Sequence, residues 1–171
     1  MGRNEIYQYY VEGKDDKAII DVLKQEFRCI ETGKVEVFNI VQDKLSDTRI
    51  RTLKRGTTVV LVYDTDIENN TEILKSNIDF LKRQTAIKKV ICIPQVKNLE
   101  DELLRACKVN NVKEITNSKS LKDYKADLIR CSNLGNRLNN CKFDITKFWN
   151  EIPKNGFKQF GNDSRSIIKK R

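Results

Sequence analysis

The stretch Thr57–Asp66, TTVVLVYDTD, joins a run of β-branched and aromatic residues directly to two acids. Residues 57–63 are uniformly apolar rather than alternating, which is typical of a central parallel strand that is covered on both faces. Such a strand needs parallel neighbours, and these are usually connected through helices that cover the sheet. The stretch therefore predicts an α/β protein in which Asp64 and Asp66 lie at the carboxyl end of an inner strand.

Three further β-type runs occur along the chain, and helical patterns alternate with them. This alternation is typical of βαβ units that build a mainly parallel four-stranded sheet flanked by helices. We expect the strands at 5–11, 35–40, 57–63 and 90–96, and Pro94 indicates that the end of the last strand is an edge or has left the ladder. We expect helices, or a helix-like connection in the second case, at 15–27, 42–55, 72–81 and 98–107.

Beyond residue 110 the patterns become weaker and the charge changes. Residues 1–110 hold 19 Lys and Arg against 18 Asp and Glu, whereas residues 111–171 hold 14 against 6. We therefore expect an α/β domain at 1–110 followed by a basic, mostly helical C-terminal extension at 111–171. Within this extension, the sequence predicts helices at 121–138 and 143–152 and a basic tail at 157–171.

The surplus of basic residues in the last third indicates a polyanionic partner, since Lys and Arg surfaces gain affinity for phosphate backbones by releasing counterions. The alternative is a solvated lysine-rich surface that has no such partner. Aromatic residues among the lysines, Trp149, Phe157 and Phe160, could stack on bases, although for Trp149 we favour core packing. The residues expected to contact nucleic acid are Lys147, Lys154, Lys158, Lys169, Lys170 and Arg171.

The composition excludes several classes of site. The chain has no histidine, which removes Ser-His-Asp and Cys-His catalysis and histidine metal sites. Its five cysteines are odd in number and form no CxxC pair, which argues against a disulfide framework and a zinc site. No apolar run approaches the roughly 18 residues that cross a bilayer, so we expect a cytoplasmic protein without membrane contact. Any catalysis must use carboxylates, lysines or a metal.

Acids follow two of the expected strands. Glu12 terminates the first strand, and Asp64 and Asp66 terminate the third with a spacing that lets both carboxylates face one side. The carboxyl ends of neighbouring strands in an open α/β sheet meet in one crevice, where ligands bind. Carboxylates gathered there raise one another's pKa unless a cation neutralises them. Mg²⁺ or Mn²⁺ accepts such oxygen ligands and can support phosphodiester hydrolysis without any histidine.

The segment Val11-Glu12-Gly13 followed by Asp16, together with the apolar strand into Asp64-Thr65-Asp66, resembles the TOPRIM domain, the catalytic α/β module of topoisomerases, primases and several nucleases. The resemblance covers residues 5 to about 108. It implies a TOPRIM-like, Rossmann-like sheet in which Glu12 is the conserved acid of the family. It also implies that Asp64 and Asp66 are the pair of acids that coordinates metal.

The motif EGKDD at residues 12–16 is similar to the corresponding motif of the small ribonuclease that matures 5S ribosomal RNA. It is also similar to that of OLD-type nucleases and related phage-defence effectors. In these proteins a second acid four residues after the glutamate helps to hold a second metal, and here that position is Asp16. Asp16 could instead cap its helix or complement the helix dipole. The sequence DTDIENN departs from the 5S-type enzyme, which has a proline and a glycine after its DxD region. OLD nucleases usually follow an ATPase domain, which would here be a separate chain.

The expected function is that of a Mg²⁺- or Mn²⁺-dependent nuclease acting on DNA or RNA, with phage defence or a toxin role suggested by the resemblance. A noncatalytic nucleic-acid-binding or regulatory subunit with the same fold is the alternative. Lys14 flanks the acids and could meet the scissile phosphate. The expected catalytic residues are Glu12, Asp64, Asp66 and Lys14, and the expected metal ligands are Glu12, Asp16, Asp64 and Asp66.

Overall fold

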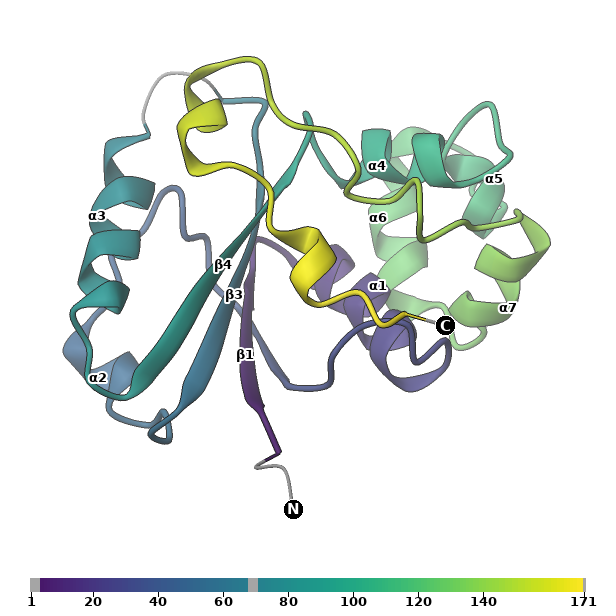
Figure 1. Ribbon diagram of the computed structural model, residues 1–171. Helices are drawn as coiled ribbons and strands as arrows, with labels where there is room; N and C mark the ends of the chain where they lie inside the picture. Colours follow the sequence, from purple (N-terminus) through teal and green to yellow (C-terminus); the bar gives the residue numbers. More distant parts are fainter. Residues whose placement is uncertain (1–3, 68–70, 171) are drawn as a thin grey trace.

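The computed structural model describes residues 4–67 and 71–170. Its centre is a four-stranded sheet in which every pairing is parallel, in the order β2-β1-β3-β4. Helices cover both faces of this sheet (Figure 1), so the predicted α/β class and parallel sheet are confirmed. The strands are β1 (Ile6–Val11), β2 (Lys34–Val37), β3 (Thr57–Asp64) and β4 (Ile87–Gln95).

The helices divide between the two faces of the sheet (Figure 1). One face carries α1 (Lys14–Gln25), α4 (Leu99–Ala106), α5 (Lys113–Thr116), α6 (Leu121–Arg130) and α7 (Leu134–Asn140). The other carries α2 (Asp47–Ile50) and α3 (Glu72–Lys82), and two 3₁₀ helices follow α7 in the chain, η1 (Gly156–Phe160) and η2 (Ser164–Ser166). Within the described part of the chain, none of these helices combines the length and the hydropathy that a membrane crossing requires.

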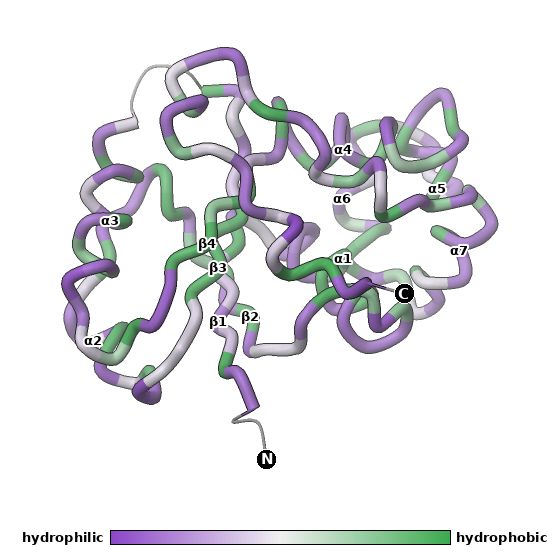
Figure 2. Tube along the Cα trace, viewed as in Figure 1, coloured by the Kyte–Doolittle hydropathy of each residue, from purple (hydrophilic) through white to green (hydrophobic). Residues whose placement is uncertain are grey.

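Strand β3 lies between two hydrophobic clusters and explains the uniformly apolar stretch. Every residue from Thr57 to Tyr63 is buried. Val60 and Val62 pack with α1 and α4, whereas Leu61 and Tyr63 pack with α3 on the other face. Because both faces of the strand are covered, no position in it favours a polar side chain. Figure 2 shows the resulting concentration of hydrophobic residues along the inner strands.

Two predicted boundaries in the first half need correction. The second strand ends at Val37 and not at residue 40, and the segment 42–55 contains only the four-residue helix α2. The side-chain oxygen of Asn39 accepts hydrogen bonds from the backbone N–H groups of Val41 and Gln42, which forms a turn at the end of the strand. Pro94 lies in an edge strand, as predicted, but remains in the ladder opposite Tyr63.

Two predicted helices after residue 120 are also wrong. The helix expected at 121–138 is divided into α6 and α7, and the segment 143–152 forms turns instead of a helix. One carboxylate oxygen of Asp144 accepts hydrogen bonds from the backbone N–H and the hydroxyl of Thr146, so this side chain stabilises a turn in place of a helix. The apolar spacing predicted burial correctly for Phe148 and Trp149, but not the backbone conformation.

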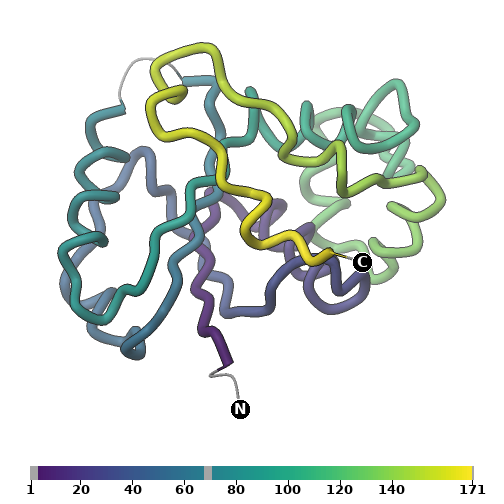
Figure 3. Tube along the Cα trace, viewed as in Figure 1, coloured from purple at the N-terminus to yellow at the C-terminus, as the bar shows by residue number. Residues whose placement is uncertain are grey.

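The chain after α7 crosses the carboxyl ends of the strands and then returns along β4 (Figure 3). Asn155 Nδ2 donates to the carbonyl of Thr65 at 2.8 Å, and the backbone N–H of Asp163 donates to the carbonyl of Cys92 at 2.8 Å. Ile168 forms an isolated antiparallel bridge with Ile30. Buried residues of the 111–170 segment belong to the same clusters as the sheet, while the domain boundary at residue 110 stays a prediction.

Candidate functional site

The carboxyl ends of three neighbouring strands bring four polar side chains together. Glu12 directly follows β1, Asp64 ends β3, Gln95 ends β4, and Asp16 lies in the first turn of α1. Asp64 and Gln95 are register partners in the parallel ladder. The arrangement follows from the topology, because parallel strands end at the same edge of a sheet.

Glu12 and Asp64 meet although 52 residues separate them in the chain, and Glu12 Oε2 accepts a hydrogen bond from the backbone N–H of Asp64 at 3.1 Å. Burial raises the pKa of Glu12, and the Asp64 donors oppose this rise only in part. Burial, and after it the Glu12 charge, raises the pKa of Asp64 to about 9. The two carboxyl groups therefore favour a bound proton or a bound cation between them.

Asp16 is held by donors on both of its oxygens. Oδ2 accepts from the backbone N–H of Gly13 at 3.0 Å, and Oδ1 accepts from Gln95 Nε2 at 2.8 Å. The first of these bonds caps α1, as the alternative interpretation of this residue allowed. Burial, with the charges of Asp15 and Asp64, raises the pKa of Asp16 to about 7. Each oxygen keeps a further lone pair, so these two bonds do not decide the predicted role of Asp16 as a metal ligand, which stays a prediction.

The acids have no cationic partner in the described part of the chain. None of the ion pairs among residues 4–67 and 71–170 includes Glu12, Asp16, Asp64 or Asp66. Lys125 of α6 pairs instead with two other acids, at 3.8 Å from Asp15 and 3.5 Å from Glu100. Asp16 and the half-buried Glu12 and Asp64 are thus held by neutral donors and form no ion pair with a described cation.

A pocket of about 330 Å³ lies in front of Glu12 and Asp64. Asp66, which is exposed, also lines it, whereas Asp16 and Lys14 do not. Lys14 is the exposed first residue of α1. A pocket of about 360 Å³ between α4 and α6 is slightly larger but mostly apolar, so the carboxylates and not the volume identify the candidate site. The remaining lining residues are Asn39, Val41, Gln42, Ile67 and Ile73.

The four predicted metal ligands can be compared with the oxygen ligands that a divalent ion requires. Over the ranges that the structure describes, no group of three or more Asp, Glu, Cys or His side chains is placed to hold a metal. The four predicted ligands form a close pair, Glu12 and Asp64, with Asp16 engaged by Gln95 and Asp66 at the rim. Mg²⁺ commonly takes one or two carboxylates and completes its shell with waters and phosphate oxygens. The pair fits an ion of this kind.

Two of the predicted nucleic-acid contacts lie close to the acids. Lys154 and Lys158 are exposed and belong to the segment that contacts the chain just after β3. In that segment Asn155 donates to the Thr65 carbonyl at 2.8 Å, and Gln159 donates to Thr71 Oγ1 at 3.4 Å. Both lysines are therefore near the carboxyl ends of the strands.

The other predicted contacts are dispersed. Lys147 is exposed in the turns that follow α7. The backbone N–H of Lys169 donates to the carbonyl of Cys29, beyond the opposite end of α1 from the acids. Lys170 follows it and is also exposed, and Arg171 lies outside the described residues. The basic residues thus do not form one patch beside the acids.

The structure excludes base stacking for two aromatic residues, so that interpretation is wrong for Phe157, while Trp149 packs in the core as favoured. Trp149 is 1% exposed and Phe157 is 0% exposed, so neither ring can reach a base. The Phe157 ring packs on Tyr63, with centroids 5.9 Å apart. Core packing of Trp149 is confirmed, and Phe160 is partly buried against the same cluster as Phe157.

Gln95 and Trp149 belong to the site but were not predicted to do so. Gln95 is 1% exposed, and its amide contacts both Asp16 and Asp64. Its place at the end of the fourth expected strand was a usable signal, since the other strand ends had been considered. The signal was overlooked because a neutral glutamine suggests neither metal binding nor acid chemistry.

Comparison of the chain with models of protein families, with curated proteins and with solved structures finds no match to any of them. The chemistry of the site is therefore argued from its residues and geometry.

Proposed function

We propose that this chain is a Mg²⁺- or Mn²⁺-dependent nuclease with a TOPRIM-like fold that cleaves phosphodiester bonds of DNA or RNA. The observation that carries the proposal is the half-buried pair Glu12 and Asp64, which receives neutral donors and forms no ion pair with a described cation. The succession of strands and helices supports it, because the acids follow β1 and β3 as the resemblance implies. Phage defence and toxin activity, with a separate ATPase subunit, are the biological settings that the resemblance suggests.

Different residues of the chain would bind the metal, transfer a proton and contact the substrate in such a reaction. A bound divalent ion would supply an activated water and would neutralise charge on the phosphate. Glu12 and Asp64 offer the carboxylate oxygens that hold it, and Asp66 lines the same pocket. Burial raises the pKa of Glu12, which suits a group that holds or passes a proton. We expect Lys154 and Lys158 to contact the substrate backbone, and Lys14 is a further candidate.

A cleavage assay tests the proposal. Labelled single- and double-stranded DNA and RNA are incubated with Mg²⁺, Mn²⁺ or EDTA, using wild type, Glu12→Gln and Asp64→Asn. We expect metal-dependent cleavage by wild type and a loss of roughly 10³-fold in each variant, since a catalytic metal contributes several kcal/mol and each 1.36 kcal/mol is a factor of ten. Asp79→Asn, which alters an exposed acid of α3, is the matched control. Equal cleavage by wild type and both site variants would contradict the proposal.

The second candidate is a noncatalytic nucleic-acid-binding or regulatory subunit of a larger complex. It is favoured by one observation, the absence from the described residues of a three-acid group placed for a metal. This candidate predicts binding that weakens steeply with salt, without metal-dependent turnover. Nucleic acid or a partner protein that co-purifies with an inactive chain would support it.

A further inference from the structure

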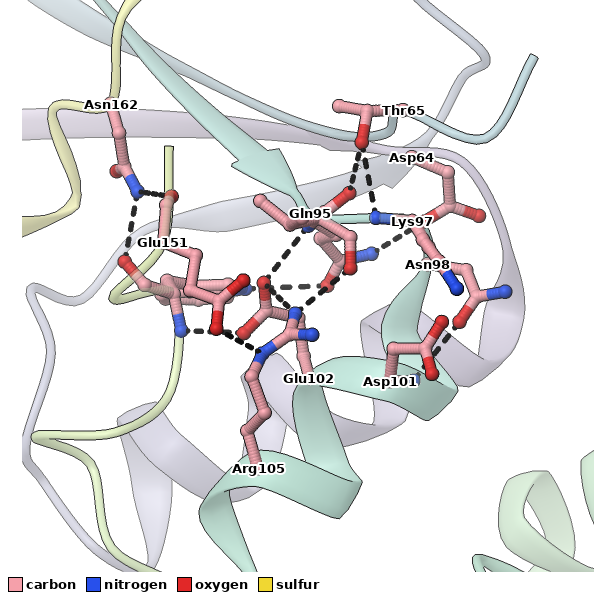
Figure 4. A network of polar contacts seen from close by, with 12 residues as sticks. Asp64, Thr65, Gln95, Lys97, Asn98, Asp101, Glu102, Arg105, Glu151 and Asn162 are labelled. Carbon is pink, nitrogen blue, oxygen red and sulfur yellow. Dashed lines mark hydrogen bonds and ion pairs between the residues drawn. The ribbon is translucent and has the colours of Figure 1, made fainter. Parts of the chain in front are cut away.

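Gln95 lies at the centre of a polar network at the end of β4 (Figure 4). Its Nε2 donates to Asp16 Oδ1 and to Asp64 Oδ1, each at 2.8 Å. Its Oε1 accepts a hydrogen bond from Trp149 Nε1 at 3.3 Å. Every polar atom of this buried amide therefore has a partner, and two of the partners are acids of the candidate site.

Trp149 determines which way the amide of Gln95 faces. With the amide reversed, its oxygen would face two carboxylates and its NH₂ group would face the indole N–H, so acceptors would oppose acceptors and donors would oppose donors. The indole N–H can only donate a hydrogen bond, and the Gln95 side chain can accept it only through its oxygen. The NH₂ group is thereby directed at Asp16 and Asp64.

Trp149 is itself held firmly. Its backbone φ is 54°, in the left-handed region that non-glycine residues adopt only when the surroundings demand it. Its N–H donates to Glu102 Oε2 at 2.9 Å, and its carbonyl accepts from Ser164 Oγ and from Asn162 Nδ2, each at 2.9 Å. The C-terminal segment is thus fixed to α4 at the position from which the Trp149 indole contacts Gln95.

We propose that Gln95 is the positioning residue of the acid site, which holds Asp64 at a fixed place relative to Asp16 and is oriented by Trp149. An amide suits this task, because it donates hydrogen bonds to a carboxylate and leaves the negative charge in place. A lysine or an arginine would neutralise that charge. It engages one oxygen of Asp64 and so leaves that acid able to bind a cation. The significance of this positioning for metal binding rests on the proposed function.

The first test needs no substitution and no metal. Hydrogen exchange of the Gln95 side-chain amide is followed by NMR in the intact chain, and the exposed Gln25 is the internal reference. We expect exchange at least about tenfold slower for Gln95, because both N–H groups are buried and bonded. In Trp149→Phe, which removes the indole donor, we expect faster exchange. Exchange of Gln95 at the rate of Gln25 in the wild type would overturn the inference.

The second test measures the consequence for the site. Gln95→Met keeps the length of the side chain and removes both donors. We expect the Mn²⁺ affinity, measured by electron paramagnetic resonance, and kcat to fall about 10- to 100-fold, with KM for nucleic acid unchanged. Gln84→Met is the matched control, since Gln84 donates only to the Phe80 carbonyl at 3.1 Å, beyond α3 and away from the acids.

The outcomes separate the two proposals. Unchanged Mn²⁺ affinity and kcat in a folded Gln95→Met protein would overturn the positioning role, although the nuclease assignment would stand. A wild type that neither binds Mn²⁺ nor cleaves would remove the proposed function, and the exchange of the Gln95 amide would still decide whether that residue is held as inferred.

Discussion

Two sets of carboxylates, one buried and one half-buried, lie at the same end of the molecule and differ in their partners. Glu102, which is 0% exposed, accepts from the backbone N–H groups of Val96 and Trp149, each at 2.9 Å, and pairs with Arg105 at 2.8 Å. Asp64 and Glu12 receive a side-chain amide and a backbone N–H, share a hydrogen bond with each other, and form no ion pair with a described cation. An acid that is paired with a cation of the protein stabilises the fold. An acid without such a partner is suited to binding a cation from solution.

The electrostatic balance differs accordingly. Burial raises the pKa of Glu102, but the Val96 N–H, Arg105 and the Trp149 N–H all act against the rise. At Asp64 the nearest charge is that of Glu12, which adds to the effect of burial. The same chemical change, a carboxylate replaced by its amide, should therefore change stability in opposite directions at the two places.

The largest change in the free energy of unfolding is expected for substitution of Glu102, the acid that is paired with Arg105. Glu102→Gln places an NH₂ group where both oxygens now accept N–H donors and leaves Arg105 without its buried partner. We expect a loss of about 3 kcal/mol, or roughly 6–12 °C in Tm for a chain of this size. Thermal and urea unfolding measure it. Glu151→Gln alters the exposed acid that lies 3.8 Å from the same arginine and should cost less than about 0.5 kcal/mol. Equal effects of the two variants would remove the distinction drawn for Glu102.

The stability of the metal-free protein should depend on pH. The pKa values of Asp16 and Asp64, about 7 and about 9, lie above those of the unfolded chain, so the folded state binds protons more tightly. This contribution to stability is complete below about pH 4 and is lost as the pH rises through 7 and 9. Each pH unit between the unfolded and the folded pKa of a group costs about 1.4 kcal/mol, so we expect a loss of at least about 2 kcal/mol between pH 5 and pH 9, measured by urea unfolding in EDTA. A rise in stability over this range would mean that the acids are neutralised within the protein.

Much of the first half of the fold was predictable because burial leaves a local pattern there. The apolar run that became β3 can be read without knowing its neighbours, and the acids that follow β1 and β3 are placed by the topology of any parallel sheet. The expected helix at 98–107 likewise has a local start signal, since Asn98 caps α4 by accepting a hydrogen bond from the Asp101 N–H.

The C-terminal segment was less predictable because distant contacts determine it. The apolar spacing around Phe148 and Trp149 imitates a helix, yet Trp149 adopts a left-handed backbone that Glu102 and Ser164 stabilise from elsewhere in the chain. No local pattern contains those partners. Gln95 was missed for a related reason, since its role exists only once Asp16, Asp64 and Trp149 surround it.

A third prediction tests the uncompensated acid directly. Asp64→Asn keeps an oxygen for the Gln95 amide and removes the free-energy cost of holding Asp64 protonated at a pH far above its pKa in the unfolded chain. We expect the metal-free protein to gain about 1 kcal/mol at pH 8, opposite in sign to Glu102→Gln, as measured by urea unfolding. We also expect 10 mM Mg²⁺ to stabilise wild type by about 1 kcal/mol, on the order of a millimolar Kd, and to have no such effect on the variant. Destabilisation of the variant in EDTA would place Asp64 with Glu102 as a structural acid.

The smallest expected effect comes from two matched pairs of lysines. Lys154 and Lys158 lie near the strand ends, whereas Lys169 and Lys170 lie beyond the far end of α1. If the substrate backbone crosses the acid site, Lys154→Gln with Lys158→Gln should raise the Kd for nucleic acid about fivefold and lower the salt slope by about 1 to 2. Lys169→Gln with Lys170→Gln removes the same charge and should change the Kd less than about twofold, because these residues are remote from the acids. Binding titrations at several salt concentrations measure both. The reverse result would place the nucleic acid on the tail, so the uncompensated acids would lie away from the bound backbone and would need a different ligand.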